Sequence, residues 1–432
     1  MKYCIILVFA LLSNFYANSQ SKAWNDSLKI NWLKQNAIKV TSVSPSDTNF
    51  SDLAPLKNVL KNAKIVMLGE THGEGNVTSA KIRLIKYLHE QMGFDMLIFE
   101  SGFYDFYRIN DSIKNGMRMD TALIRAVFSD MSGMNEFDPL LKYVNDCSVK
   151  GNKSFSISGF DEQNDWSFFK KDIEKNFKGI DPLSEENRKI FYTLIDKANS
   201  FKPSPFGNVN DSLQYFKDVN LYIDASKKMA DKEKGSYWVQ IFKSLEAYSK
   251  VAMSWEDAGN GQIPFYKVTN IRDAQMADNL IWLIDHNPNK KFIIWSASNH
   301  LSRNLKTLTE TDDTAFFEHF HPMGEYIHNK YGDKAYSMGF TAAGGTRYAK
   351  GMMAEPQKIT SVLNNSIECY MQRADFNYGI INYRNLSKDN FLNQENYSNP
   401  FGYNSQKLGV WPNVLDGIFF INEIVPPNFK DY

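Results

Sequence analysis

Short apolar runs recur along the chain, and most are bounded by charged or turn-forming residues. Within each run consecutive positions are apolar, which is typical of strands buried on both faces of a sheet, whereas a strand with one solvated face would alternate. The pattern predicts five strands at residues 64–69, 95–100, 155–160, 291–295 and 335–340, and two further strands at residues 379–382 and 417–421.

Helical spacing fills the intervals between several of these runs. After the first run, apolar residues recur three and four positions apart, as on one face of a helix. Asn76 is suited to cap the N-terminus of this helix, and Gly93 to end it after Met92. A second helix, about residues 271–285, leads into the run at 291–295. Strand, helix and strand in succession indicate a βαβ unit, and so predict an α/β fold with a mostly parallel or mixed central sheet flanked by helices.

Two long stretches lack this alternation of strand and helix. Residues 165–261 are rich in charged residues and tyrosine, carry helix-period apolar positions, and predict a helical insertion, broken at residues 204–207. Residues 383–413 are polar and turn-rich, and predict a long surface excursion. We therefore expect a single domain over residues 20–432 that contains the insertion.

The N-terminus has the pattern of a secretory signal peptide. Lys2 precedes a short apolar run at residues 5–12, and the small residues at 17–19 favour cleavage before Gln20. The run is too short to span a bilayer, and no later segment is long and apolar enough to do so. We therefore expect residues 1–19 to be removed, and the mature protein to be periplasmic or secreted without a stable membrane anchor.

Composition narrows the classes of partner. The 49 basic and 49 acidic residues balance to zero formal charge, which argues against a nucleic-acid partner.

Of the three cysteines, Cys4 lies in the predicted signal peptide, and a disulfide between Cys147 and Cys369 is permitted in an exported protein but not required. Without a Cys-x-x-Cys pair or a Cys/His cluster, no structural zinc is expected. The composition leaves the oligomeric state open.

The loop at residues 69–73, Gly-Glu-Thr-His-Gly, is the leading candidate for chemistry. It follows the first predicted strand, and ligands of α/β sheets gather at strand carboxyl ends. The helix that follows directs its positive end at the loop, which favours a neutral His72, the form that a general base needs. A solitary loop histidine is more often a structural residue. The neighbouring Glu70 and the two flanking glycines favour a functional His72.

Three other candidates occupy equivalent positions at the ends of predicted strands. Glu100, Asp161 and His300 each end or follow such a strand, and adjacent parallel strands would place Glu100 beside Glu70. Convergence on one rim is more informative than any one of them alone. The Gly-x-Ser-x-Gly motif of serine esterases, the phosphate-binding P-loop and the His-Glu-x-x-His motif of metalloproteases do not occur at the places where they would function.

Six short motifs in order resemble the erythromycin esterase family. They are Gly-Glu-Thr-His-Gly at 69–73, the helix at 81–88, Phe-Glu-Ser-Gly at 99–102, Gly-Phe-Asp at 159–161, Arg-Asp-x-x-Met-Ala-x-Asn at 272–279 and Met-Gly-Glu-Tyr-Ile at 323–327. The resemblance implies a cofactor-independent hydrolase of small-molecule esters, without a covalent intermediate. In it His72 would activate water, Glu70 and Glu100 would orient His72 and the water, and His300 would stabilise the oxyanion. Arg83, Asp161 and Arg272 would contribute to substrate binding.

Two departures from the family pattern bear on the substrate. The loop lacks the alanine that the family has between its glutamate and threonine, so Glu70 and His72 are one residue closer together. Ala297 replaces one of two family histidines in the run 295–300, and weak or absent macrolide hydrolysis is therefore expected. Two alternatives stay open: a metal- or haem-binding protein or metallohydrolase that uses the same glutamates and histidines as ligands, and a binding protein on a decayed hydrolase scaffold.

Overall fold

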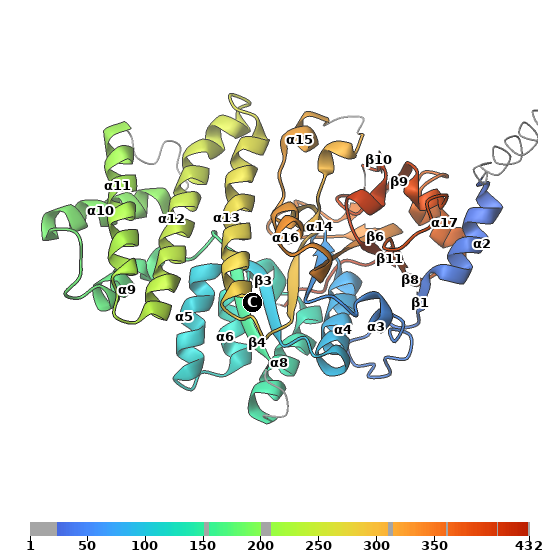
Figure 1. Ribbon diagram of the computed structural model, residues 1–432, viewed down its shortest axis with the longest axis horizontal. Coiled ribbons are helices and arrows are strands. Elements are labelled where there is room, and N and C mark those ends of the chain that lie inside the picture. Colours follow the sequence, from blue (N-terminus) through green and yellow to red (C-terminus); the bar gives the residue numbers. More distant parts are fainter. Residues whose placement is uncertain are drawn as a thin grey trace, which may run out of the picture.

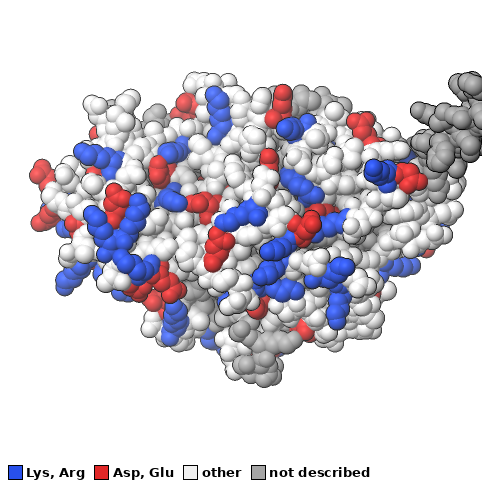
Figure 2. All heavy atoms as spheres, in the orientation of Figure 1, with Lys and Arg blue, Asp and Glu red and all other residues white. Residues whose placement is uncertain are grey.

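A computed structural model describes residues 24–150, 155–199, 209–309, 314–359, 362–403 and 405–430. The predicted signal peptide at residues 1–19 lies outside these ranges. Of the described helices, none combines the length and apolar character needed to cross a membrane. On the face of the molecule in Figure 2, basic and acidic side chains are interspersed, as the balanced composition suggests.

A nine-stranded sheet forms the centre of the molecule (Figure 1). Its order is β1-β8-β11-β6-β2-β5-β3-β4, and β7 pairs with the end of β6. From β11 to β4 all neighbours are parallel, whereas β8 and β1 are antiparallel at one edge. The strands are β1 (Ile38–Val40), β2 (Ile65–Glu70), β3 (Met96–Gly102), β4 (Ser156–Asp161), β5 (Phe292–Ala297), β6 (Ala335–Arg347), β7 (Gln357–Lys358), β8 (Tyr378–Asn382) and β11 (Gly417–Ile424). The α/β prediction and all seven predicted strands are confirmed.

The strand order differs from the expectation in one respect that matters for the site. β2 and β3 are joined through α4 (Gly75–Met92), but β5 lies between them and pairs with both. Glu70 and Glu100 are therefore not on neighbouring strands. The strand between them, β5, begins about 190 residues after the end of β3, and no local pattern in the sequence predicts that it lies there.

Helices cover both faces of the sheet. Along β2, Val66 and Leu68 pack into the core beneath α4 and α8 (Asp138–Lys150), whereas Ile65 and Met67 pack into the core beneath α13 (Phe265–Asp285) and α16 (Met323–Tyr331). Alternate residues thus meet apolar layers on opposite sides, which explains why the strands are continuously apolar.

The start of α4 is not capped as predicted. Glu74 occupies the N-cap position and makes no capping hydrogen bond with its side chain. Asn76 instead uses its amide to bridge the end of β11, donating to the Glu423 carbonyl at 2.8 Å and accepting from the Val425 N–H at 3.2 Å. Gly93 ends the helix with φ +70°, as its sequence position predicts.

Helices form one end of the molecule, beside α13 (Figure 1). They are α9 (Phe169–Asn176), α10 (Glu185–Asn199), α11 (Val209–Lys227) and α12 (Lys232–Gly259). Within the part of residues 165–261 that the structure describes, no strand occurs. Stacked and edge-on aromatic rings fill the interior of this bundle, for example Tyr222 against Phe242 with ring centroids 5.0 Å apart.

The predicted surface excursion at residues 383–413 is wrong. The segment folds into two short 3-10 turns and the antiparallel pair β9 (Asn396–Ser398) and β10 (Lys407–Gly409), and it buries Phe391 and Trp411 completely. The Trp411 indole donates to the Asn396 carbonyl at 2.9 Å. A few large buried side chains hold this polar segment against the rest of the protein. Because they follow no regular spacing in the sequence, the periodicity of apolar residues does not predict their burial.

The remaining helices connect these layers. They are α2 (Asp26–Asn36), α3 (Leu56–Val59), α5 (Phe103–Lys114), α6 (Met119–Ala126), α7 (Ser129–Ser132), α14 (Ser298–Leu301), α15 (Thr314–His319) and α17 (Ile367–Arg373). Cys147 on α8 and Cys369 on α17 are not joined by a disulfide.

Candidate active site

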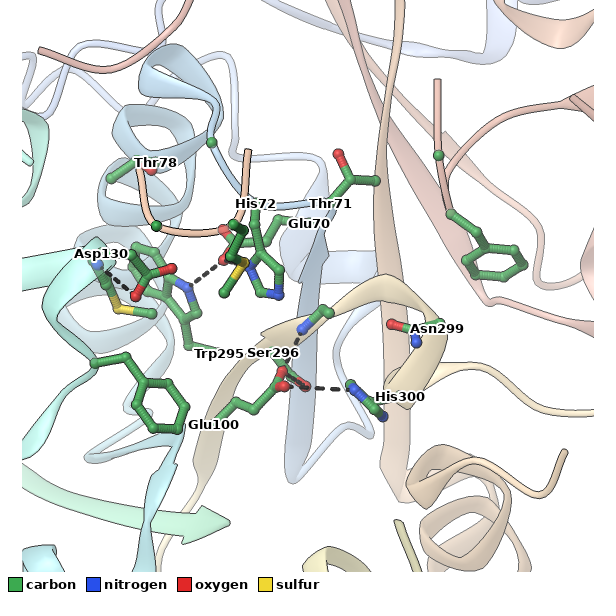
Figure 3. Close-up of a pocket in the computed structure, with 18 of the residues that line it drawn as sticks. Glu70, Thr71, His72, Thr78, Glu100, Asp130, Trp295, Ser296, Asn299 and His300 are labelled. Carbon is green, nitrogen blue, oxygen red and sulfur yellow. Dashed lines mark hydrogen bonds and ion pairs between the residues drawn. The ribbon is translucent and has the colours of Figure 1, made fainter. Parts of the chain in front are cut away.

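A cavity of about 750 Å³ opens at the carboxyl ends of β2, β3 and β5 (Figure 3). The local strand order is β6-β2-β5-β3. The connection that leaves β2 crosses β5 to reach β3, and the connection that leaves β5 crosses β2 in the other direction to reach β6. The two connections depart in opposite directions, which makes this a topological switch point, where α/β proteins bind their ligands. Glu70, His72, Glu100, Arg272 and His300 all line this cavity.

Glu70 and His72 form a pair on the loop after β2. The imidazole Nδ1 lies 3.2 Å from Glu70 Oε1, which leaves Nε2 for exchange with the cavity. The His72 backbone has φ +66°, a left-handed conformation that a side chain other than glycine adopts at a free-energy cost. Gly73 follows with φ +84°, and a Cβ there would lie 2.6 Å from the Ala349 backbone, so the tight turn depends on glycine.

Two buried groups hold the Glu70 carboxylate in place. Lys81 of α4, fully buried, donates from Nζ to Oε2 at 3.0 Å, and the Trp295 indole of β5 donates to Oε1 at 3.2 Å. Lys81 also lies 4.1 Å from the centre of the Trp295 ring, a cation–π contact. Although burial would raise the pKa of Glu70, Lys81 and His72 lower it to about 2, so Glu70 carries a negative charge at any physiological pH.

The carboxylates around His72 override the expected effect of the helix N-terminus. Burial opposes protonation of the imidazole, but the hydrogen bond to Glu70 and the negative charges of Glu70, Glu100 and Glu74 raise the pKa of His72 to about 9. The expectation of a neutral His72 at pH 7 is therefore wrong. About 30% of the side chain is exposed, and water screens these charges in part.

Glu100 is the centre of a second cluster. Its Oε2 accepts from Ser296 Oγ and from the Ala297 N–H, both at 2.7 Å, and its Oε1 accepts from Arg272 Nη2 at 3.0 Å. Burial would raise the pKa of Glu100, but the charges of His300, Arg272 and His72 lower it well below the ordinary range. Glu100 is thus a fixed anion that positions the end of β5 and the guanidinium of Arg272.

His300 lies on α14, directly after β5, and a contact with Asp273 on the side away from the cavity orients its imidazole. Its Nδ1 is 2.8 Å from Asp273 Oδ1, and Asp273 is itself fixed by the Met323 N–H at 2.9 Å. On the cavity side Nε2 lies 3.2 Å from Arg272 Nη1 and 3.5 Å from Glu100 Oε1. Burial opposes protonation of this imidazole, but the negative charges of Asp273 and Glu100 raise the pKa of His300.

Two acidic residues at the end of β4 lie behind Arg272. Asp161 accepts from Arg272 Nη2 at 2.5 Å and from Nε at 3.2 Å, and Glu162 Oε2 lies 3.7 Å from Nε. Both side chains are completely buried, and neither carboxyl oxygen of Glu162 has a hydrogen-bond partner. Burial and the neighbouring Asp161 raise the pKa of Glu162 well above its usual value, which favours the protonated acid. Asp161 reaches the cavity only through Arg272.

Arg83, predicted to bind substrate, lies elsewhere. Its guanidinium donates to Asp52 at 2.8 and 3.0 Å and to the carbonyls of Ser42 and Asn49 at 2.8 and 2.6 Å, and Arg83 is absent from the cavity wall. Arg83 follows Lys81 by two positions, about 200° around the helix, so both cannot face the site. Lys81 is the cationic residue of α4 that reaches the site.

Sequence reasoning missed Lys81, Trp295 and Asp273. Lys81 falls four residues after Val77 and four before Ile85, in the middle of the buried stripe of α4, and a charge in that position is a usable signal. Asp273 follows Arg272 directly, but no local pattern indicates that it contacts His300. The outer wall of the cavity was also missed, since it comes from distant segments: Phe128, Met131, Met134, Phe316, Phe317, Met352, Phe401 and Lys407.

Glu162 offers a test of the buried acid behind Arg272. Because the pKa of Glu162 is raised in the folded protein, the unfolded chain releases this proton at lower pH than the folded protein does. The free energy of unfolding of the wild type therefore falls as the pH rises above the pKa of the unfolded chain, about 4.5. Glu162→Gln removes that penalty. Its stability relative to wild type should increase from pH 5 to pH 8, by up to about 1.4 kcal/mol per pH unit.

Urea unfolding at several pH values measures this difference. Glu162→Ala is the matched control, because it removes the acid but leaves a cavity and should be less stable than Glu162→Gln throughout. A pH-independent difference between Glu162→Gln and wild type would show that Glu162 is ionised in the folded protein.

Among the residues that the structure describes, no group of three or more histidine, cysteine, aspartate or glutamate side chains is arranged to hold a metal ion. Glu70 and Glu100 are instead directed at protein cations and hydrogen-bond donors. Each of these two carboxylates is thus held in place by protein donors.

Comparison with known proteins agrees with the fold and identifies a family. The family model for erythromycin esterase matches residues 89–423, which include Glu100, Asp161, Arg272 and His300 but not the loop of Glu70 and His72. YbfO of Bacillus subtilis, a protein assigned to the hydrolases, is 25% identical over 98% of this chain and 96% of its own length. Erythromycin esterase type II of Escherichia coli is 21% identical over 83% of this chain and 89% of its own.

Solved structures show the same fold. A Bacillus cereus protein superposes with a TM-score of 0.73 at 18% identity, covering 94% of this chain and 100% of its own. A mutant of an erythromycin esterase in its open conformation superposes with a TM-score of 0.70 at 15% identity, covering 91% and 99%. Because the family model spans most of the chain, this protein belongs to the erythromycin esterase family of hydrolases.

Proposed function

We propose that the protein hydrolyses carboxylic esters by direct attack of a water that His72 activates. The observation that carries this proposal is the Glu70–His72 pair, which shares one cavity with His300 (Figure 3) and with Arg272. A base on one side and cations on the other are what a hydrolytic addition to a carbonyl needs. Membership of a hydrolase family supports the same class of reaction.

The reaction begins from the neutral form of His72. Nε2 accepts a proton from water as the water oxygen bonds to the ester carbonyl carbon, and the carbonyl oxygen becomes an oxyanion. The imidazolium then returns the proton to the alkoxide oxygen as the carbon–oxygen bond breaks, releasing an acid and an alcohol. Glu70 stabilises the imidazolium in the interval, and Lys81 keeps Glu70 in position.

Arg272 and His300 are the groups suited to bind the oxyanion. Both line the cavity, and both are braced by anions behind them, Arg272 by Asp161 and His300 by Asp273. A fixed donor of this kind contributes about 10²- to 10³-fold in rate when it faces the developing charge. Glu100 serves as a positioning residue, because its two oxygens are occupied by Ser296, the Ala297 N–H and Arg272.

The natural substrate is a small-molecule ester or lactone whose apolar part fits the outer wall. Ala297 lines the cavity where the family has a histidine, so macrolides should be poor substrates for want of that imidazole. The N-terminal pattern supports export of the protein to the periplasm or the medium, after cleavage near Gln20.

The test is a panel of p-nitrophenyl esters and simple lactones, assayed with and without EDTA. We expect hydrolysis that survives the chelator with an unchanged rate, because the acidic residues of the site are occupied by protein donors. Intact-mass spectra taken during turnover should contain no acyl-enzyme. Loss of activity in EDTA that a divalent cation restores would establish the metallohydrolase alternative, and an acyl adduct would rule out direct attack by water.

A further inference from the structure

Two large aromatic side chains are exposed where α12 leads into α13. Trp255, near the end of α12, is 46% exposed, and Phe265, the first residue of α13, is 43% exposed. Their rings are in contact, with centroids 5.4 Å apart. Two exposed aromatic rings in contact gather more apolar surface in one place than the singly scattered apolar side chains that are normal on a protein surface.

These two rings continue into the cavity. Phe265 lies 6.3 Å from Phe316 of α15, Phe316 lies 5.7 Å from Phe317, and Phe317 lies 6.1 Å from Phe401, all between ring centroids. Phe316, Phe317 and Phe401 line the cavity that also contains His72. The five residues, here called the aromatic track, thus form an unbroken line from the surface to the wall of the candidate active site.

The orientation of the rings favours one kind of occupant. Neighbouring planes are inclined by 68° at Trp255 and Phe265, 32° at Phe265 and Phe316, 68° at Phe316 and Phe317, and 52° at Phe317 and Phe401. Rigid sugar rings stack on flat faces that lie in one plane, which this series does not offer. A flexible methylene chain can follow a surface that turns at each ring, burying apolar area along its whole length.

We infer that the aromatic track binds the long acyl chain of the ester substrate, with the ester group in the cavity and the chain directed outward toward Trp255. The inference rests on the proposed ester hydrolysis and narrows its substrate to esters of medium- or long-chain acids. Methionines 131 and 352 line the same cavity and give its interior adaptable apolar surface around the first carbons of such a chain.

Chain-length selectivity tests the inference. The quantity measured is the ratio of kcat/KM for p-nitrophenyl dodecanoate to kcat/KM for p-nitrophenyl acetate. In Trp255→Ala and in Phe265→Ala the ratio should fall about 10-fold, because about two methylene groups lose contact with each ring. The value for acetate should stay unchanged, since that substrate is too short to reach Trp255 or Phe265. The matched control is Phe168→Ala, which removes an equally exposed aromatic ring, 45% exposed, from the helical end of the molecule.

The outcomes separate this inference from the proposed function. An unchanged ratio in Trp255→Ala and Phe265→Ala, with acetate hydrolysed normally, overturns the inference and leaves ester hydrolysis intact. Failure to hydrolyse any ester overturns the proposed function. Calorimetric binding of dodecanoate then decides the inference, which stands only if both variants bind it about 10-fold more weakly than wild type. A dimer that dissociates on Trp255→Ala without a change in the ratio would assign the surface to a second copy of the chain and overturn the inference.

Discussion

His72→Ala is expected to lower kcat/KM for the best ester substrate by about 10²- to 10⁴-fold while the protein stays folded. The loss follows because no other side chain on the loop can take the proton from water. Glu70 has a pKa of about 2 and is already engaged by Lys81 and Trp295, which makes it a weak base. The side chain of His72 lies at the rim and contributes little to the core.

His72→Asn is the sharper variant. Asparagine tolerates the left-handed backbone that His72 adopts, so this variant should fold with little added strain, and its amide can still hydrogen-bond to Glu70. It cannot transfer a proton, and its activity should be nearly as low as that of His72→Ala. Circular dichroism provides the folding control. Near-normal turnover by folded His72→Asn would move the role of base to another residue of the rim, with His300 the leading candidate.

Arg272→Met should lower both activity and stability. The guanidinium bridges Glu100 and Asp161 within the protein, and its loss leaves two buried carboxylates without their cation. Removing one partner from a buried ion pair costs about 3–5 kcal/mol of folding free energy. Loss of an oxyanion donor costs a further factor of about 10²–10³ in kcat/KM. Urea unfolding and ester kinetics measure the two effects separately.

Arg272→Lys is the control for charge alone. Lysine restores a positive charge but cannot present the planar fork that contacts Asp161 through two nitrogens and Glu100 at the same time. Stability should recover in part, and activity should recover less. Wild-type activity in Arg272→Lys would mean that only the charge, and no directed hydrogen bond, acts on the substrate.

The seven predicted strands were predictable because they are buried on both faces and therefore largely apolar, whereas the short and partly exposed β1 and β7 lack this pattern. The order of the strands in the sheet was not predictable, because β5, which lies between β2 and β3, follows α9 to α12 in the sequence and is therefore far from both strands along the chain. The aromatic anchors of residues 383–413 were equally hidden, since Phe391 and Trp411 sit in an otherwise polar segment. Local patterns report how a segment is buried, and not which distant segment covers it.

Four residues of the site were predictable because parallel strands all end on the same side of the sheet, where ligands bind. They are Glu70, His72, Glu100 and His300. The charge state of His72 could not be found in this way. The loop sequence contains both the helix N-terminus, which disfavours a proton, and Glu70, which favours one, and it does not show that Glu70 hydrogen-bonds to His72 Nδ1 or that Glu100 adds its charge from another strand. The choice between Lys81 and Arg83 was available from helical periodicity, since Lys81 alone lies in the stripe of α4 that faces Trp295.

The pH dependence of kcat/KM tests most directly whether His72 is the base. With the pKa of His72 raised to about 9, the neutral imidazole is scarce at pH 7 and increases about 10-fold per pH unit below that value. Hydrolysis of p-nitrophenyl acetate, corrected for the uncatalysed rate, should therefore rise from pH 6, inflect near pH 9 and level off above that value. In Glu70→Gln the inflection should move to lower pH, because the carboxylate that favours the imidazolium is gone. A profile that is flat from pH 6 to pH 10, or an inflection that stays in place in Glu70→Gln, would contradict the assignment of His72 as the base.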